Sequence, residues 1–241
     1  TLWVQYFNIH NVMNSLIKQG RAQETIIVMP NADGKGGYLT NSSVAGNYED
    51  YITQELVEFI DSNYRTLPQR ESRAIGGGSR GGYGAMNFAI KHPDVYCAVV
   101  SHSGKLSFDL LKDDIRLKPN DFYKNMAIAF SPNPDSPLLY DYPADDEGNL
   151  LEDVWERWLE YNPFSLVKTH QENLKRLTGI YFDHGTSDTG TSVEQARNFD
   201  RALTEAGIPH VYEEYAGGHY DRWTSRLYVA LPFLSDMLSQ R

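Results

Sequence analysis

The sequence predicts an α/β fold, in which helices cover both faces of a mostly parallel sheet. Five short apolar runs with strand character alternate with longer segments in which apolar residues recur at helical spacing. Alternation of this kind requires right-handed crossovers between parallel strands. The chain has 241 residues, of which 41% are hydrophobic and 22% charged, which is enough for one sizeable core. We therefore expect a single domain over residues 1–241.

The expected elements follow one another along the chain. Strands are expected at Thr25 to Met29, Arg73 to Gly77, Tyr96 to Ser101, Gly179 to Asp183 and His210 to Tyr215. Helices are expected at Asn11 to Gln19, Tyr48 to Tyr64, Gly81 to Lys91, Ser192 to Ala206 and Arg222 to Gln240. Gly207 and Pro209 end the fourth helix, because a glycine cap followed by proline cannot continue it.

Residues 105–176 interrupt the alternation. They show no strand pattern, and they contain a proline-rich stretch at 131–137 and an acidic run at 145–147. A segment of this length within one domain is usually functional or forms a small subdomain. Because it follows a strand end, where ligand sites of α/β sheets gather, we expect a helical, loop-rich, lid-like insertion over the carboxyl ends of the strands.

The most informative motif lies between the second strand and the third helix. It has the form G-x-S-x-G, as Gly77-Gly78-Ser79-Arg80-Gly81. A turn that passes directly from strand to helix strains its central residue and needs small neighbours, so glycines flank a serine whose Oγ is exposed. The N-terminus of the helix favours a developing negative charge there. The motif predicts that Ser79 is a catalytic nucleophile.

The same residues also satisfy a competing motif. Residues 76–81 match G-x-G-x-x-G, the dinucleotide-binding fingerprint, between a strand and a helix. That site requires an acidic residue at the end of the next strand to bind the ribose. The next strand ends in Ser101-His102-Ser103-Gly104, and Asp94 precedes it. We therefore favour the nucleophile over the dinucleotide site.

Charge and cysteine content limit the classes of binding partner that the chain is expected to have. The net charge is −10 and the pI is about 5.1, which argues against nucleic acid or an anionic membrane as the main partner. Cys97 is the only cysteine, which excludes an intrachain disulfide and leaves the compartment, secreted or cytoplasmic, open. No stretch is long and apolar enough to span a bilayer. A neutral ester substrate is compatible with these properties.

A serine nucleophile needs a base, and the base needs an orienting acid. Of the seven histidines, His219 lies in a glycine-rich loop just after the last strand, so it is the expected base. His102 and His184 are at strand ends and could support the site. Asp188 lies in the loop after the fourth strand, where it can turn toward a histidine, whereas Asp183 lies within the strand and is expected to be structural. The order Ser, Asp, His is that of the α/β-hydrolases.

These residues resemble a known family. The stretch Glu71 to Ala85, then Lys91 to Asp94, Ser103-Gly104, Gly185 with Asp188, and Gly217-Gly218-His219 with Trp223 are similar to the esterase D type of esterase. That family contains feruloyl esterases, acetylxylan esterases, carboxylesterases, S-formylglutathione hydrolases and mycolyltransferases. The resemblance covers nearly the whole chain and is weakest across residues 105–176. It implies an α/β-hydrolase fold, Ser79 as nucleophile, His219 as base and Asp188 as acid, without a metal or organic cofactor.

The chain departs from this family at two places. Arg80 follows the nucleophile where an uncharged residue is usual, although its backbone N–H can still serve as an oxyanion donor. The family also begins with strands and a His-Gly loop that supplies the other donor, and residues 1–4 resemble the segment just after that loop. The absent third strand would lie between Thr25 to Met29 and Arg73 to Gly77, so we expect the N-terminal strands to be missing from these 241 residues or to come from elsewhere.

The combined prediction is a serine carboxylesterase that forms an acyl-enzyme, with a feruloyl or acetyl ester of a plant polysaccharide as the favoured substrate. Tyr220, Trp223, Trp155 and Trp158 are candidates to stack on a phenolic ring or sugar; the alternative for Trp155 and Trp158 is that they seal the insertion onto the core. An acyltransferase with the same triad is one alternative function. A catalytically silent module that binds carbohydrate or protein is the other.

Overall fold

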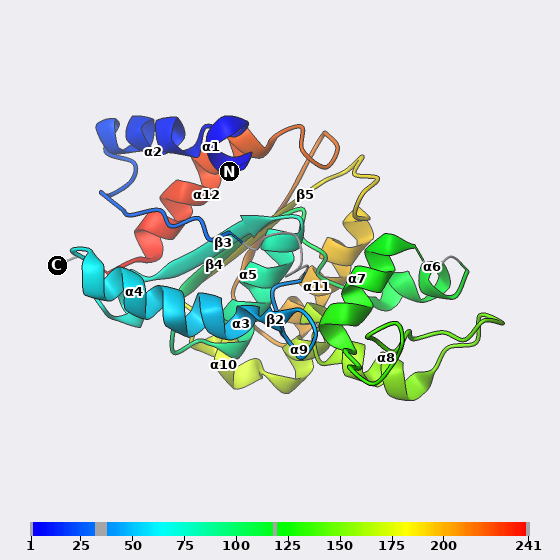
Figure 1. Ribbon diagram of the computed structural model, residues 1–241. Helices are drawn as coiled ribbons and strands as arrows, with labels where there is room; N and C mark the ends of the chain where they lie inside the picture. The colour runs from blue at the N-terminus through cyan, green and yellow to red at the C-terminus, as the bar shows by residue number, and fades with distance from the viewer. Residues whose placement is uncertain (1, 32–37, 118–119, 240–241) are drawn as a thin grey trace.

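The computed structural model describes residues 2–31, 38–117 and 120–239 (Figure 1). Its main sheet has four parallel strands in the order β3-β4-β5-β6. Their bounds are β3 Ala74–Gly78, β4 Ala98–His102, β5 Gly179–Gly185 and β6 Val211–Tyr215. These four match the expected strands to within two residues at each end. The parallel α/β class is confirmed.

The first expected strand is wrong. The residues from Thr25 to Met29 belong to no strand of the described chain, although they are extended and apolar. Strand formation requires a partner for the backbone N–H and C=O groups, and β3 is the edge of the four-stranded sheet as described. The run is apolar and rich in β-branched residues, as a buried strand is, but no neighbouring strand of the described residues pairs with it.

The helices form one layer on each face of the sheet (Figure 1). Helices α5 and α11 pack on one face and α12 on the other, with α2 against α12. The bounds of the elements outside residues 105–176 are α1 Leu2–Gln5, α2 Ile9–Lys18, α3 Tyr48–Asp50, the π-helical η1 Tyr51–Glu55, α4 Leu56–Asn63, η2 Arg70–Ser72, α5 Arg80–Lys91, α11 Val193–Glu205 and α12 Trp223–Met237. A two-strand antiparallel ladder joins β1 Asn41–Ser42 to β2 Gly46–Asn47. All five expected helices are present.

Residues 105–176 are helical and rich in loops, as expected. Their elements are η3 Asp109–Leu111, α6 Lys112–Leu117, α7 Asp121–Phe130, α8 Glu152–Leu159, α9 Pro163–Thr169 and α10 Gln171–Lys175, with isolated bridges at Pro132–Tyr140 and Ala144–Leu150. Helices α6, α7 and α8 lie on the side of the molecule toward which the strands run (Figure 1). An aromatic cluster including Phe108, Phe130 and Trp158 packs this region onto Tyr83 of α5.

The two tryptophans of α8 are core residues. Trp155 is 1% exposed and Trp158 0%, and the Trp158 Nε1–H donates to Ser131 Oγ at 2.9 Å. Neither ring has a face open to a ligand. The expectation that they stack on substrate is therefore corrected: they seal the insertion, because an apolar helix face without a sheet of its own must bury its largest rings.

Candidate active site

The candidate nucleophile occupies a strained turn. Ser79 has φ 54° and ψ −121° between the last residue of β3 and the first of α5. A β-carbon on Gly77 would stand 2.3 Å from the carbonyl carbon of Gly81, so only glycine allows the two backbones to approach. The Ser79 N–H donates to the His102 carbonyl at 2.8 Å, which ties the turn to β4. Positive φ at a serine costs about 1–3 kcal/mol and is typically retained at functional sites.

The candidate acid and base are hydrogen-bonded. His219 Nδ1 lies 2.6 Å from Asp188 Oδ2, and the Asp188 side chain is fully buried. Backbone N–H groups of Gly190 and Thr191 donate to the other carboxylate oxygen at 2.8 and 2.9 Å. Because the carboxylate accepts at Nδ1, His219 is held in the tautomer whose Nε2 has a free lone pair. A nitrogen in that state can accept a proton from a serine hydroxyl.

Backbone contacts between two loops create this pair. The Thr186 N–H donates to the Tyr215 carbonyl at 2.9 Å and the Ser187 N–H to the Gly217 carbonyl at 3.0 Å. A β-carbon on Gly185 would meet the Gly217 carbonyl oxygen at 2.5 Å, so this close approach requires glycine. The loop after β5 is thereby fixed against the loop after β6, which places Asp188 beside the histidine.

A second histidine supports the same carboxylate. His184 is fully buried, and its Nε2 lies 2.7 Å from the Thr191 carbonyl and 3.2 Å from Asp188 Oδ2. Burial alone would raise the pKa of Asp188, but hydrogen bonds from His184 and His219 outweigh it and hold that pKa well below its usual range. Asp188 is therefore a carboxylate at neutral pH. The sequence placed His184 near the site but did not show which group it contacts.

Asp183 has different partners. Its carboxylate accepts from His102 Nδ1 at 2.9 Å, from Arg226 Nε at 2.8 Å and from the Tyr181 hydroxyl at 2.9 Å. Burial would raise its pKa, and the neighbouring His102 and Arg226 lower it below the usual value. Among the described residues, no hydrogen bond or ion pair joins Asp183 to His219. It ties β4 and β5 to α12, which agrees with the structural role expected for it.

Trp223 connects the turn to the base. A β-carbon on Gly78 would lie 2.3 Å from the Trp223 ring, and the ring centroids of His219 and Trp223 are 5.8 Å apart. Trp223 also stacks on Trp3 at 5.5 Å and is 3% exposed, so its expected role in stacking on substrate is corrected to that of a packing wall. Tyr220 packs against it at 4.9 Å and is 56% exposed, which leaves its ring available to a ligand.

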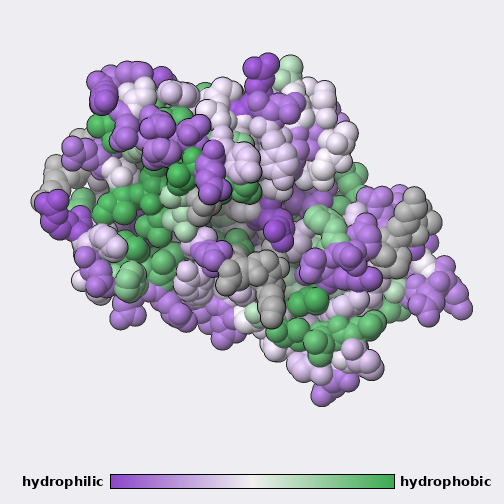
Figure 2. Space-filling view, turned by 45° about the horizontal axis from the view of Figure 1, so that its top comes forward, coloured by the Kyte–Doolittle hydropathy of each residue, from purple (hydrophilic) through white to green (hydrophobic). Residues whose placement is uncertain are grey.

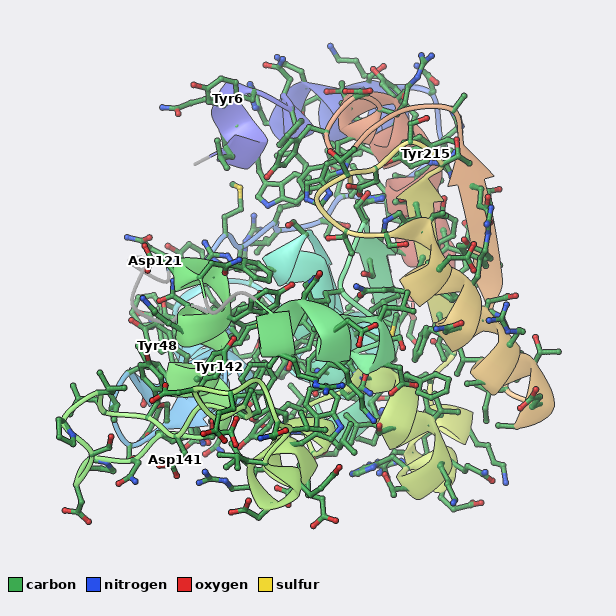
Figure 3. All side chains as sticks on the ribbon, turned by 90° about the vertical axis from the view of Figure 1, so that its right-hand side faces the viewer. Tyr6, Tyr48, Asp121, Asp141, Tyr142 and Tyr215 are labelled. Atoms are coloured by element: carbon green, nitrogen blue, oxygen red, sulfur yellow. The ribbon has the colours of Figure 1, made fainter. Side chains whose placement is uncertain are left out.

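Ser79, Asp188 and His219 follow β3, β5 and β6, so all three lie at the carboxyl edge of one parallel sheet. Ligand sites of α/β sheets form at this edge. In Figure 3, Tyr215, the last residue of β6, is labelled near the tip of that strand. Asp141 and Tyr142 of the insertion are labelled in the lower half of the same view. Arg80 is the exposed first residue of α5, so its N–H has no partner within the helix and can face an anion.

Two further residues near this edge were given no role in the site by the sequence. Lys105 is 7% exposed, and burial lowers its pKa to about 8 despite the charges of Asp114 and Asp188. Its Nζ lies 5.0 Å from the Phe122 ring centroid. Ser103 has φ 48°, and its Oγ lies 3.2 Å from the Tyr215 hydroxyl. Both residues directly follow β4, which lies between the strands that lead to Ser79 and Asp188. This position in the sequence could have indicated that they lie near the site.

Within residues 2–31, 38–117 and 120–239, no group of three or more His, Cys, Asp or Glu side chains is arranged to hold a metal ion. The described helices include none with the length and apolar character needed to cross a bilayer.

A serine on a strand-to-helix turn, followed in the chain by a paired aspartate and histidine at the same sheet edge, defines the α/β-hydrolase class. The sequence model of one family within it, described as "Putative esterase", matches residues 1–234. The chain belongs to this esterase family.

Curated relatives carry esterase names. Two esterases of Mycobacterium tuberculosis strains are 31% identical over 211 residues, which is 82% of this chain and 42% of theirs. An acetyl esterase of Caldicellulosiruptor saccharolyticus is 26% identical over 199 residues, with 67% of its length matched. The chain thus spans less than half the length of the two mycobacterial relatives.

Solved structures share the fold. A ferulic acid esterase superposes with a TM-score of 0.72 at 26% identity, and the match covers 98% of this chain and 80% of that one. A fluorophosphonate-binding serine hydrolase of Staphylococcus aureus superposes with a TM-score of 0.70 at 21% identity, over 99% of this chain and 78% of that one.

Proposed function

We propose that this chain is a serine carboxylesterase with Ser79 as nucleophile, His219 as general base and Asp188 as orienting acid. The observation that carries the proposal is the 2.6 Å hydrogen bond between His219 and a fully buried Asp188, on the sheet edge where Ser79 occupies a strained turn. A histidine with only a structural role would not need a buried carboxylate at its Nδ1. A serine with only a surface role would not need a strained turn.

The reaction follows from these positions. Ser79 Oγ attacks the ester carbonyl carbon while its proton passes to His219 Nε2, and Asp188 stabilises the imidazolium that results. The tetrahedral oxyanion is stabilised by N–H groups at the start of α5, with Arg80 supplying one. As the intermediate collapses, the alcohol leaves with the proton from His219. Water activated by the same histidine then hydrolyses the acyl-enzyme.

The substrate we propose is a neutral ester with an aromatic or sugar component, such as a feruloyl or acetyl ester. Support comes from the exposed Tyr220 ring beside His219, whose centroids are 4.6 Å apart, and from relatives named acetyl esterase and ferulic acid esterase. Residues 105–176 are proposed as the lid of the substrate site within one domain. The net charge of −10 is compatible with a neutral substrate.

The test is labelling with a fluorophosphonate probe that carries a fluorophore, followed by peptide mapping. We expect stoichiometric labelling of Ser79 in the parent protein and none in Ser79→Ala. Ser187→Ala is the matched control, because Ser187 is an exposed serine in the loop of Asp188. Labelling should be unchanged in that control. An unlabelled but folded parent protein would favour the catalytically silent module.

Hydrolysis and acyl transfer use the same triad, so only their products distinguish the two reactions. We expect hydrolysis of p-nitrophenyl acetate and methyl ferulate to release free acid even when an alcohol acceptor such as glycerol is present. Ester exchange in place of acid release would assign the chain as an acyltransferase, while leaving the roles of the three residues intact.

A further inference from the structure

One buried cation near the triad has no partner. Lys105 follows β4 and is 7% exposed, yet its ammonium group forms no hydrogen bond or ion pair within the described residues. Burial lowers its pKa to about 8, and the nearby carboxylates of Asp114 and Asp188 oppose that change, so the group is charged at neutral pH. Burying a charge is costly unless it is paired. The N–H groups of Lys105 are therefore available to a ligand.

The backbone brings Lys105 close to the nucleophile. Gly104, the residue before it, packs against the first turn of α5. A β-carbon on Gly104 would stand 3.0 Å from the carbonyl carbon of Gly82 and 3.1 Å from the backbone nitrogen of Tyr83. The N–H of Tyr83 donates to the Ser79 carbonyl at 2.9 Å. Lys105 thus leaves β4 beside the turn that holds Ser79.

An aromatic ring lies beside the ammonium group. The Phe122 ring centroid is 5.0 Å from Lys105 Nζ, and Phe122 is 40% exposed. Phe122 meets Tyr38 edge to face at 6.0 Å, and Tyr38 meets Tyr83 in the same way at 5.3 Å. A row of rings therefore connects the start of α5 with α7 of the insertion. In Figure 2 the insertion, at the lower right, has hydrophobic residues next to hydrophilic ones on its surface. A ligand with both an aromatic ring and a polar oxygen suits this combination.

The charges around Lys105 indicate what kind of oxygen it can bind. Asp188 of the triad and Asp114 of α6 both act on its charge, and Asp114 accepts from the Tyr123 hydroxyl at 2.9 Å. A carboxylate or phosphate on the ligand would be attracted by one ammonium group and repelled by two carboxylates. A phenol, which titrates near about pH 10, is neutral at neutral pH and avoids this repulsion. A phenolic hydroxyl also carries the ring that Phe122 can contact.

We propose that Lys105 determines specificity by donating a hydrogen bond from Nζ to the phenolic oxygen of the acyl group, while Phe122 packs against the phenol ring. The inference rests on the proposed esterase function and deepens it. Of the two esters named there, it selects the hydroxycinnamoyl ester, of which the feruloyl ester is one, over the acetyl ester. An acetyl group has neither a ring for Phe122 nor an oxygen beyond the ester itself.

Two substrates that differ by one hydroxyl test the proposal. We expect kcat/KM for methyl 4-hydroxycinnamate to exceed that for methyl cinnamate by about 10- to 100-fold, the usual effect of one hydrogen bond to a charged group. Lys105→Met should bring this ratio close to one, whereas Lys105→Arg, which keeps a charged donor, should retain a preference. A ratio near one in the parent protein, or an unchanged ratio in Lys105→Met, would overturn the proposal.

The matched control is another lysine that contacts a ring of the insertion. Lys112 Nζ lies 5.4 Å from the Trp155 ring centroid, and Trp155 is enclosed in the core of the insertion. Lys112→Met removes the same charge and the same kind of contact, so it should leave the ratio of the two kcat/KM values unchanged. An equal fall of the ratio in both variants would show that loss of packing in the insertion, and not a contact with the phenol, sets the preference.

Binding to Ser79→Ala separates this proposal from the proposed function, because it requires no turnover. Calorimetric titration should give a Kd for methyl 4-hydroxycinnamate about tenfold or more below that for methyl cinnamate, and Lys105→Met in the same background should remove the difference. Equal affinities together with fluorophosphonate labelling of the parent protein would overturn the role of Lys105 and leave the esterase assignment intact. A preference in binding without labelling or hydrolysis would support the role of Lys105 and overturn the esterase assignment.

Discussion

The two sides of β3 differ in how completely they are satisfied. At its carboxyl end, the loops after β5 and β6 hold Asp188 with four hydrogen-bonding groups, from His184, His219, Gly190 and Thr191. At its other edge, β3 has no hydrogen-bonded strand among the described residues, and the buried Nε2 of His102 has no hydrogen-bond partner among them. The acid–base pair is thus held by many groups of the described residues, whereas this edge of the sheet is not paired within them. The comparison separates residues that act on the reaction from those that act on the stability of the sheet.

The largest expected effect is on the reaction at the carboxyl ends of the strands. Ser79→Ala should abolish p-nitrophenyl acetate hydrolysis, with a loss of about 10⁶ in turnover, because loss of a triad nucleophile removes the covalent route. The thermal midpoint should stay nearly unchanged, because alanine keeps the β-carbon and therefore the strain of the turn. Steady-state kinetics with calorimetry checks both. Residual turnover above a few per cent in protein of verified mass would exclude Ser79 as the nucleophile.

The second prediction separates the two buried aspartates. Asp188→Asn should lower turnover by about 10⁴, because the amide favours the wrong histidine tautomer. Asp183→Asn should instead lower the free energy of unfolding by about 3–5 kcal/mol, because it leaves Arg226 without its buried partner. Kinetics and denaturant melts of both variants decide. The reverse pattern would assign the orienting role to Asp183.

The smallest effect concerns Lys105. Burial lowers its pKa to about 8, whereas the unfolded lysine titrates near 10.4, so between these values the unfolded state binds more protons and stability rises with pH. From pH 8 to pH 10.5 we expect this one residue to add up to about 3 kcal/mol to the free energy of unfolding. Lys105→Met should lack the rise. Parallel denaturant melts give the difference, and coincident pH profiles would mean that the lysine is solvated.

Local backbone requirements were readable from the sequence alone. The glycines around Ser79 are dictated by the close approach of neighbouring groups. The order of the Ser79, Asp188 and His219 motifs follows the order of the strands that carry them. The four paired strands and the five helices were predictable for the same reason, since periodicity reports which face of an element is buried.

Only the tertiary structure decided the properties that depend on distant partners. The residues from Thr25 to Met29 have a strand pattern, yet a strand requires pairing with a second segment, and these residues belong to no sheet of the described chain. Trp155, Trp158 and Trp223 are of a residue type that is common at binding surfaces. Their rings are nevertheless enclosed by neighbours from other parts of the chain. His184 and Lys105 acquire their relation to Asp188 from the sheet order. A sequence specifies which groups are able to pair, and the fold determines which of them find a partner.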